Sequence, residues 1–202
     1  TAGGAIWFSN GTGVLKGEFT DNYANNGALV YINGSAKVSL EGGNYKGNTA
    51  SRGQSIYFGN GTLNIGNVES FGDTINLPTG KIFNITADIS GRSIKVVPVA
   101  DLADMTKIAN VSSEEFAKRA RVAINIDGYA LYAEGKEIYA NTPKENDING
   151  DGIVNAADAA ELLKYISGID VSYIDMDKAD INSDGEYNIL DVIALWQYIN
   201  KN

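Results

Sequence analysis

The chain has 202 residues, of which 44% are hydrophobic, and it contains no Cys and no His. This length allows one large or two ordinary globular domains, and the composition excludes disulfides, zinc–thiolate sites and histidine general bases. The formal net charge of −9 argues against nucleic-acid binding, and no apolar run is long enough to span a membrane.

Short β-prone segments that end in an Asn-Gly turn recur along the first third of the chain. They are Ile6–Thr12, Leu29–Ser35 and Ile56–Thr62, at offsets of 23 and 27 residues. A second register begins at the aromatic residues Phe19, Tyr45 and Phe71, at offsets of 26 residues each. Repeats of this length, built from short strands and Gly/Asn turns, indicate a β-solenoid with one coil per repeat.

These repeats carry short motifs. They are Gly3-Gly-Ala-Ile6, Phe19-x-x-Asn22-x-Ala24 and Tyr45-x-x-Asn48-x-Ala50. The motifs resemble the GGAI and FxxN repeats of right-handed parallel β-helix surface proteins, such as polymorphic adhesin-like proteins. The resemblance implies a right-handed parallel β-helix, which we expect over residues 1–98 as a spacer or as an adhesive module for polysaccharide. No signal peptide is visible, so we expect the chain to be a piece of a longer protein with further coils.

Mixed elements follow the repeats. Lys81–Thr86 and Ser93–Val97 alternate as strands, and Ser112–Ala120 begins with a capping box and predicts a short helix. Residues Val122–Ala133 predict a hairpin that turns on Asp127-Gly128. We interpret residues 99–140 as an α+β cap that shields the open edge of the solenoid, and residues 141–146 as a linker.

Two twelve-residue stretches near the C-terminus repeat one pattern, 33 residues apart. They run from Asp147 to Asp158 and from Asp180 to Asp191, with oxygen-bearing side chains at positions 1, 3, 5, 9 and 12 and Gly at position 6. A hard divalent cation needs six to eight oxygens around one point, and this spacing is typical of an EF-hand calcium loop. A merely solvated Asp/Asn/Gly turn is the alternative, and the full duplication argues against it.

The predicted ligands of two calcium ions follow from this pattern. In the first loop they are Asp147, Asn149, Asp151, the carbonyl of Ile153, Asn155 through a water, and Asp158. In the second loop they are Asp180, Asn182, Asp184, the carbonyl of Glu186, Asn188 and Asp191. Position 12 is Asp and not the longer Glu, so we expect the modest affinity of extracellular modules.

An amphipathic helix follows each loop. We expect helices over 156–167 and 189–200, each N-capped by the Asn at position 9 of its loop. Residues 147–202 hold nine Asp and two Glu against three Lys, a net charge of −8, so we expect their folding to depend on calcium. Neither loop is preceded by a convincing helix, which separates this segment from calmodulin-like sensors and makes a calcium switch the weaker reading.

A duplicated calcium loop, each followed by one helix, resembles a type I dockerin over residues 147–202. The resemblance implies a small all-α, EF-hand-like module without catalysis of its own, which binds a cohesin domain on a scaffoldin in an extracellular, cellulosome-like assembly. Carried onto this sequence, the family's recognition positions are Ala156, Ala157, Leu163, Lys164, Ile189, Leu190, Trp196 and Gln197. We therefore expect a secreted protein whose partner is a cohesin.

The recognition positions depart from the Ser-Thr pair of many dockerins. Here the pairs are Ala156-Ala157 and Ile189-Leu190. Because one half is small and the other bulky and apolar, we expect one binding orientation, centred on Ile189, Leu190 and Trp196. The alternative for Trp196 is an ordinary core aromatic.

The rival hypothesis is a polysaccharide lyase or hydrolase of the β-helix type. Its candidate acids, bases and cations are Asp21, Asp73, Lys16, Lys46 and Arg52. We expect these to be solvated turn residues, since no two carboxylates occupy equivalent places in adjacent coils. The aromatic side chains could stack against sugars, although we expect most of them inside the solenoid; they are Trp7, Phe8, Tyr31, Tyr57 and Phe58.

Overall fold

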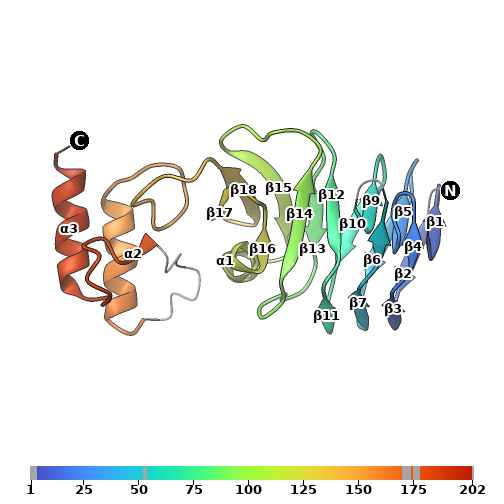
Figure 1. Cartoon of the computed structure of the whole chain (residues 1–202), viewed down its shortest axis with the longest axis horizontal. Helices are drawn as coiled ribbons and strands as arrows, with labels where there is room; N and C mark the ends of the chain where they lie inside the picture. Colours follow the sequence, from blue (N-terminus) through green and yellow to red (C-terminus); the bar gives the residue numbers. More distant parts are fainter. Residues whose placement is uncertain (1–3, 52–53, 170–173, 175–177, 202) are drawn as a thin grey trace.

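The structure, a computed structural model, describes residues 4–51, 54–169, 174 and 178–201. A stack of β-coils forms the N-terminal part, a mixed cap follows it, and two helices lie at the other end (Figure 1). Gly3 of the first motif and Arg52 lie outside the described residues.

One six-stranded sheet runs the length of the solenoid, and all its neighbouring strands are parallel. In spatial order its strands are β1 (Ile6–Phe8), β5 (Val30–Ile32), β9 (Ile56–Phe58), β12 (Thr74–Leu77), β14 (Ile94–Pro98) and β16 (Ile124–Asn125). The Asn-Gly segments thus stack on one another, but the register predicted from offsets of 23 and 27 residues is wrong by one residue: Ile6 pairs with Val30 and Val30 with Ile56, at offsets of 24 and 26.

A second sheet of seven strands forms another face. Five of its strands are parallel: β2 (Thr12–Leu15), β6 (Lys37–Leu40), β10 (Thr62–Ile65), β13 (Phe83–Ile85) and β15 (Thr106–Val111). The antiparallel strands β18 (Glu137–Asn141) and β17 (Ala130–Glu134) complete it. Parallel stacking therefore continues beyond residue 98, into the segment interpreted as the cap.

The remaining strands close the coils. They are β3 (Glu18–Thr20), β7 (Asn44–Lys46) and β11 (Ser70–Phe71) in one sheet, and β4 (Tyr23–Ala24) and β8 (Thr49–Ala50) in another. The aromatic residues of the second register stack in the first of these sheets: the ring centroids of Phe19 and Tyr45 lie 5.7 Å apart, and those of Tyr45 and Phe71 6.4 Å.

Alternate residues of each strand point into the solenoid, because side chains of a β-strand alternate between its two faces. Ile32 of β5 and Phe58 of β9 are fully buried, whereas Trp7 of β1 is 62% exposed. The middle residues of the three strands stack on the outer face, where the ring centroids of Tyr31 and Tyr57 lie 4.7 Å apart. The expectation that most of these aromatic residues are internal is therefore wrong for this register.

An asparagine ladder explains the FxxN motif. The side-chain oxygen of Asn48 accepts hydrogen bonds from the main-chain N–H of Asn22, at 3.1 Å, and from its side chain, at 2.7 Å. In the next coil Asp73, one residue before the expected position at Thr74, accepts from the main-chain N–H of Asn48 at 3.0 Å. The side chains of Asn48 and Asp73 thus each accept a hydrogen bond from a main-chain N–H group of the preceding coil. Buried backbone N–H groups need such partners.

The cap contains helix α1 (Glu114–Ala123), which packs against β16, β17 and β18. Its N-cap is Ser113, which accepts from the N–H of Phe116 at 3.2 Å, so the predicted Ser112 capping box is wrong by one residue. The predicted hairpin over Val122–Ala133 is also wrong: β16 pairs with β14, and β17 pairs with β18. An Asp-Gly turn can also join strands of two different sheets. Here the strand before the turn, β16, pairs with the parallel edge of β14.

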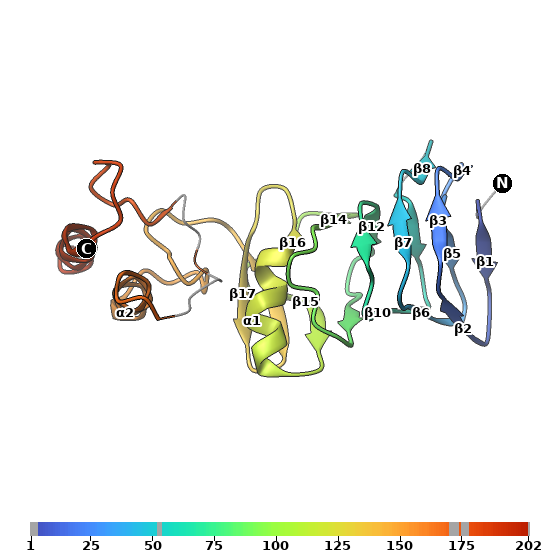
Figure 2. The same cartoon turned by 90° about the horizontal axis from the view of Figure 1, so that it is seen from below.

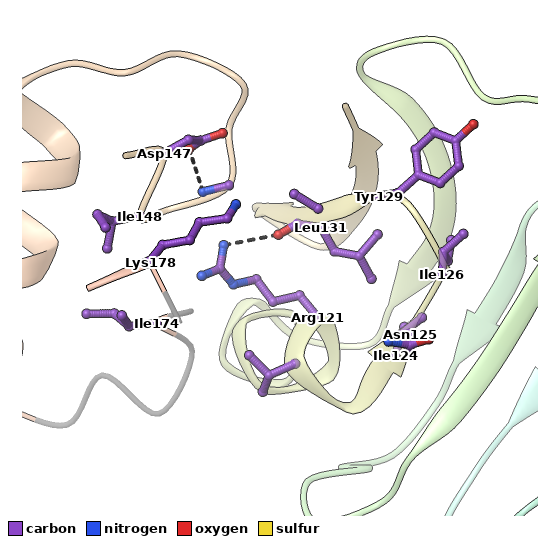
Figure 3. Close-up of a pocket in the computed structure, with 13 residues that line it drawn as sticks. Arg121, Ile124, Asn125, Ile126, Tyr129, Leu131, Asp147, Ile148, Ile174 and Lys178 are labelled. Atoms are coloured by element: carbon purple, nitrogen blue, oxygen red, sulfur yellow. Dashed lines mark hydrogen bonds between the residues drawn. The ribbon is translucent and has the colours of Figure 1, made fainter. Parts of the chain in front are cut away.

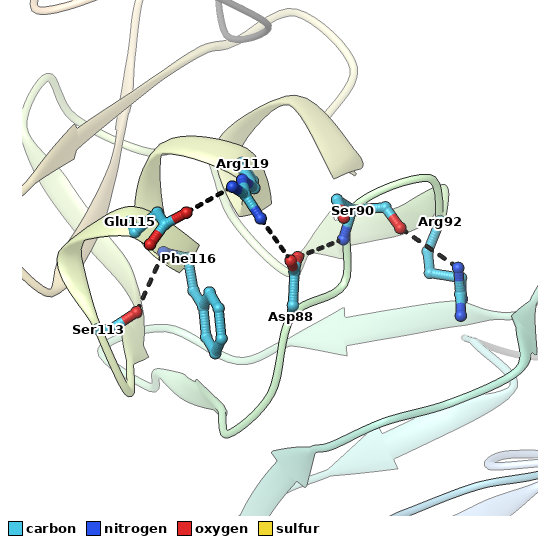
Figure 4. A network of polar contacts seen from close by, with 7 residues as sticks. All are labelled: Asp88, Ser90, Arg92, Ser113, Glu115, Phe116 and Arg119. Carbon is cyan, nitrogen blue, oxygen red and sulfur yellow. Dashed lines mark hydrogen bonds and ion pairs between the residues drawn. The ribbon is translucent and has the colours of Figure 1, made fainter. Parts of the chain in front are cut away.

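A polar network ties α1 to the loop after β13 (Figure 4). Asp88 accepts hydrogen bonds from the N–H of Ser90 at 2.9 Å and from Arg119 at 2.8 Å. These two donors, Ser90 first, hold the pKa of Asp88 below its usual value. Arg119 also pairs with Glu115 at 2.5 Å along the helix.

The C-terminal segment has a small core of its own. Helices α2 (Ala156–Ile166) and α3 (Ile189–Ile199) pack against each other. The buried residues of this core are Ile148, Ala159, Leu162, Ile174, Ala179 and Leu195. Figure 2 shows the two helices side by side, with α1 and β17 between them and the parallel coils.

Candidate metal centres and docking surface

The first loop, which precedes α2, is folded around two buried carboxylates. Asp147 accepts from the N–H groups of Gly150 at 2.8 Å and Gly152 at 2.9 Å. Asp158 accepts from the N–H groups of Ile148 at 2.8 Å and Asn149 at 3.0 Å. The carboxylates at positions 1 and 12 therefore bind main-chain N–H groups of the loop, and the loop curves around their oxygens.

The second loop, which precedes α3, has a similar arrangement, although its first carboxylate accepts from positions 5 and 6 and that of the first loop from positions 4 and 6. Asp180 accepts from the N–H groups of Asp184 at 3.0 Å and Gly185 at 2.9 Å. Asp191 accepts from the N–H of Asn182 at 3.2 Å. Gly152 and Gly185, at position 6 of their loops, share a φ of +84°, a left-handed conformation that favours glycine.

The last carboxylate of each loop also belongs to a helix. Asn155 is the N-cap of α2 and accepts from the N–H of Ala157 at 2.7 Å, while Asp158 accepts from the N–H of Asn155 at 2.8 Å. Asn188 and Asp191 form the same capping box on α3. Position 12 therefore fixes the helix start and the loop closure together.

The electrostatics of the first loop favour a bound cation. Asp147 and Asp158 are completely buried. Burial is the main cause that raises the pKa of both carboxyls, and the negative charges of Asp147 and Asp151 raise that of Asp158 further. Buried carboxylates that repel one another are stabilised by a cation between them, so these residues fit a metal ion.

The predicted ligands of each ion all lie within one twelve-residue loop. Asn149 and Asp151 lie between the buried carboxylates, and the side chain of Asn149 donates to Asp151 at 3.1 Å. The equivalent pair, Asn182 and Asp184, is joined at 2.8 Å. Across the part of the chain that the structure describes, no three Asp, Glu, His or Cys side chains form a ready metal cluster. A calcium ion in these loops would also take amide and main-chain oxygens, which are ligands that calcium accepts.

The recognition positions are on the surface of the two helices. Ile189, Leu190 and Trp196 of α3 are 51%, 53% and 52% exposed, so Trp196 is not a core aromatic of this fold. Two further apolar side chains of α3, Ile193 and Tyr198, are also exposed. Helical spacing places them among the expected positions, and this amphipathic pattern is the signal by which the sequence could have indicated them. On α2 the expected positions are likewise exposed; they are Ala156, Ala157, Leu163 and Lys164.

Two of the candidate catalytic side chains of the solenoid, Asp73 and Lys16, have structural partners, and the expectation of a solvated turn residue is wrong for Asp73, which is buried. Asp73 is 4% exposed and accepts a hydrogen bond from the side chain of Asn48 at 2.5 Å. Burial raises the pKa of the Asp73 carboxyl. Lys16 lies 3.6 Å from Glu41 on the surface.

The structure thus defines a β-solenoid followed by a small helical segment with two like loops. Residues 145–200, here called the dockerin segment, match the family model of the dockerin type I domain. The comparisons with curated proteins and with solved structures gave no significant match. The chain therefore consists of a β-solenoid segment followed by a dockerin type I segment.

Type I dockerin domains generally bind calcium and dock onto cohesin domains, and the proteins that carry them are typically extracellular. The oxygen-rich loops of this chain agree with that chemistry. Among the described residues, no helix has the length and the apolar character that a membrane crossing requires.

Proposed function

We propose that this chain is a secreted anchoring protein, in which the dockerin segment binds a cohesin domain of a scaffoldin in a cellulosome-like assembly. The observation that carries the proposal is the pair of loops in which the glycine at position 6 donates to the carboxylate at position 1, each leading into a helix with exposed recognition positions. The β-solenoid is then a spacer or an adhesive module that the dockerin segment holds on the assembly.

Each loop holds one calcium ion in this proposal. The ligands are the side chains at positions 1, 3, 5 and 12, the carbonyl at position 7 and a water held by the Asn at position 9. The ion supplies the positive charge that the buried Asp147 and Asp158 lack within their own loop. Calcium binding and folding of the dockerin segment are then coupled, since a bound ion stabilises only the folded loop.

The exposed face of α3 is the main contact with the cohesin. In Figure 1 this helix is the element farthest from the solenoid, so a partner can approach it without meeting the coils. Ile189, Leu190 and Trp196 offer apolar area that Ala156 and Ala157 of α2 cannot match. Binding energy at protein interfaces concentrates in such aromatic and aliphatic anchors, so we expect one binding orientation.

The chain itself has an anchoring role and no catalytic one in this proposal. The alternative is the C-terminal part of a dockerin-bearing β-helix lyase or hydrolase. Asn48 binds both carboxylate oxygens of Asp73, which argues against catalysis by this acid; the alternative therefore requires an active groove on other coils. Assays of sugar release with the full-length protein distinguish the two, since an anchor releases no product with or without calcium.

The experiment is a titration of the chain with a panel of cohesins, in calcium and in chelator. We expect binding to one or more cohesins in calcium alone. Changing Ile189, Leu190 and Trp196 to Ala is expected to weaken that binding at least a hundredfold, whereas Val99→Ala, at an exposed apolar residue that follows β14, leaves it unchanged. Binding that persists in chelator, or that ignores the triple change, contradicts the proposal.

A further inference from the structure

The first loop is held by the solenoid cap. Asn141, at the end of β18, donates from its side-chain nitrogen to the carbonyl of Gly150 at 2.9 Å. Its side-chain oxygen accepts from the N–H of Met105 at 2.7 Å, so it is fixed from both sides. Asn141 is completely buried, which makes these bonds part of the interior and not of a solvated surface.

Arg121 of α1 makes a second connection. Its guanidinium donates to the carbonyl of Leu131 on β17, at 3.2 Å, and to the carbonyl of Asn149 in the loop. Arg121 is 8% exposed and lies in the pocket between cap and loop that Figure 3 shows. Two adjacent carbonyls of the loop, at positions 3 and 4, are therefore bound by the cap.

These contacts do not compete with a metal ion. In a loop of this type the main-chain ligand is the carbonyl at position 7, here that of Ile153. The carbonyls of Asn149 and Gly150 are directed to donors outside the loop. The cap can therefore fix the path of the main chain through two carbonyls that are not predicted ligands.

The residue at position 4 of each loop reflects whether that loop contacts the cap. It is Gly150 in the first loop, with φ +76°, and Ser183 in the second loop, with φ +60°. A Cβ atom on Gly150 would lie only 2.7 Å from the carbonyl oxygen of Leu131. Since Ser183 has the same left-handed conformation with a side chain, the space left for the cap, and not the loop geometry alone, requires glycine at residue 150.

The two loops also differ in exposure. Asp147 and Gly150 of the first loop are buried, whereas Asn182, Ser183 and Gly185 of the second loop are exposed. The first loop is therefore an interface with the cap, and the second loop is presented to solvent.

We propose that Arg121 and Asn141 are positioning residues of the first calcium site, and that calcium in this loop fastens the dockerin segment to the solenoid cap. This inference rests on the proposed calcium binding. A main chain that is already ordered loses less conformational freedom when the ion binds, so the cap raises the affinity of the first loop. By reciprocity, calcium in that loop stabilises the contact with the cap.

Two amide protons report on the loops separately. Gly152 donates to Asp147, and Gly185 donates to Asp180, each at 2.9 Å. Because each glycine is bonded to the first carboxylate of its own loop, its amide signal follows the occupancy of that loop. The test is a calcium titration of the full chain by amide NMR, with hydrogen exchange of β17 and β18 measured at both ends of the titration.

Three variants are compared with the unchanged chain. Asn141→Ala removes a donor of the cap and changes no residue of the loop. Gly150→Ser inserts a side chain between the first loop and the cap. Ser183→Gly is the reverse change at the equivalent position of the second loop. We expect the first two to weaken calcium binding at the Gly152 signal about tenfold and to leave the Gly185 signal unaffected. Ser183→Gly shows how much the left-handed serine itself contributes, and we expect less than a threefold change.

Hydrogen exchange gives the independent readout. Calcium is expected to slow exchange in β17 and β18 of the unchanged chain, and to do so much less in Asn141→Ala and Gly150→Ser. Equal affinities of the first loop in all variants, or exchange in the cap that ignores calcium, overturn the inference while both loops still bind. If neither glycine signal responds to calcium, the proposed function fails with it, so the two failures are distinct.

Discussion

The asparagine ladder makes a quantitative prediction about Asn48. Its side chain receives two hydrogen bonds from Asn22 and donates to Phe19, Lys46 and Asp73. Asn48 is 7% exposed, so its loss leaves several buried groups without partners. At about 1 kcal/mol for each net bond, and allowing for the weak 3.3 Å contact, Asn48→Ala should lower the free energy of unfolding by about 3 to 4 kcal/mol.

Asn22 provides the matched control for this prediction. It occupies the same motif position one coil earlier, and among the described residues its side chain donates to Asn48 alone, at 2.7 Å. Asn22→Ala should therefore lower the unfolding free energy by about 1 kcal/mol. Urea unfolding of both variants, in excess calcium, measures the two values. Equal losses, or a loss below about 1 kcal/mol for Asn48→Ala, would refute the idea that the ladder stabilises the coils.

Three further predictions concern charge, a buried phenol and the metal. The pKa of Asp88 is lowered by Ser90 and Arg119, so its stabilising contribution is present above the unfolded pKa of about 3.9 and is lost as the pH falls through the folded value. Asp88→Asn should lower stability by about 1 kcal/mol at pH 7 and by less below pH 4, measured by urea unfolding at each pH. Tyr45 is buried and donates to the carbonyl of Leu15 at 2.6 Å, so Tyr45→Phe should lower the unfolding free energy by about 1 to 2 kcal/mol, measured in urea at pH 7. Chelation of calcium should unfold the dockerin segment and leave the solenoid folded, because the cores are separate; circular dichroism should then lose helix and retain strand.

Each of these predictions has an outcome that contradicts it. A loss for Asp88→Asn that stays constant from pH 7 to pH 3 would show that its charge is not involved. Unchanged stability of Tyr45→Phe would show that water replaces the phenol as the partner of Leu15. Helical signal that survives chelation would separate folding of the dockerin segment from metal binding.

Regular spacing made parts of the fold predictable. The coils could be predicted from the repeats, because equivalent residues of successive repeats stack in neighbouring strands. Helices α2 and α3 begin directly after Asn155 and Asn188, because a capping residue is a local signal that needs no distant partner. The tight turns of the two loops were also predictable, since a glycine at position 6 is a local signal of left-handed backbone.

Features that depend on distant partners could not be predicted. The Asp127-Gly128 turn is real, but β16 joins the parallel edge of β14, and no local pattern announces that choice. The ladder continues through Asp73 and not through Thr74, because the Asp73 carboxylate is the group that lies within hydrogen-bond distance of the Asn48 N–H. The contact of Asn141 with the first loop was equally hidden, since this residue belongs to a segment that reads as a linker.

The arrangement in Figure 1, with β1 and α3 at opposite ends, has a mechanical consequence. The hydrogen bonds between parallel coils run along the line that joins these ends, as do the bonds from Asn48 to its neighbours. In the proposed assembly, a pulling force between a cohesin bound to α3 and a surface bound to the coils would therefore load these bonds lengthwise, one layer at a time. Under such tension the coils are expected to peel off in sequence and not to shear all at once, so the solenoid yields gradually and protects the docked end from sudden rupture.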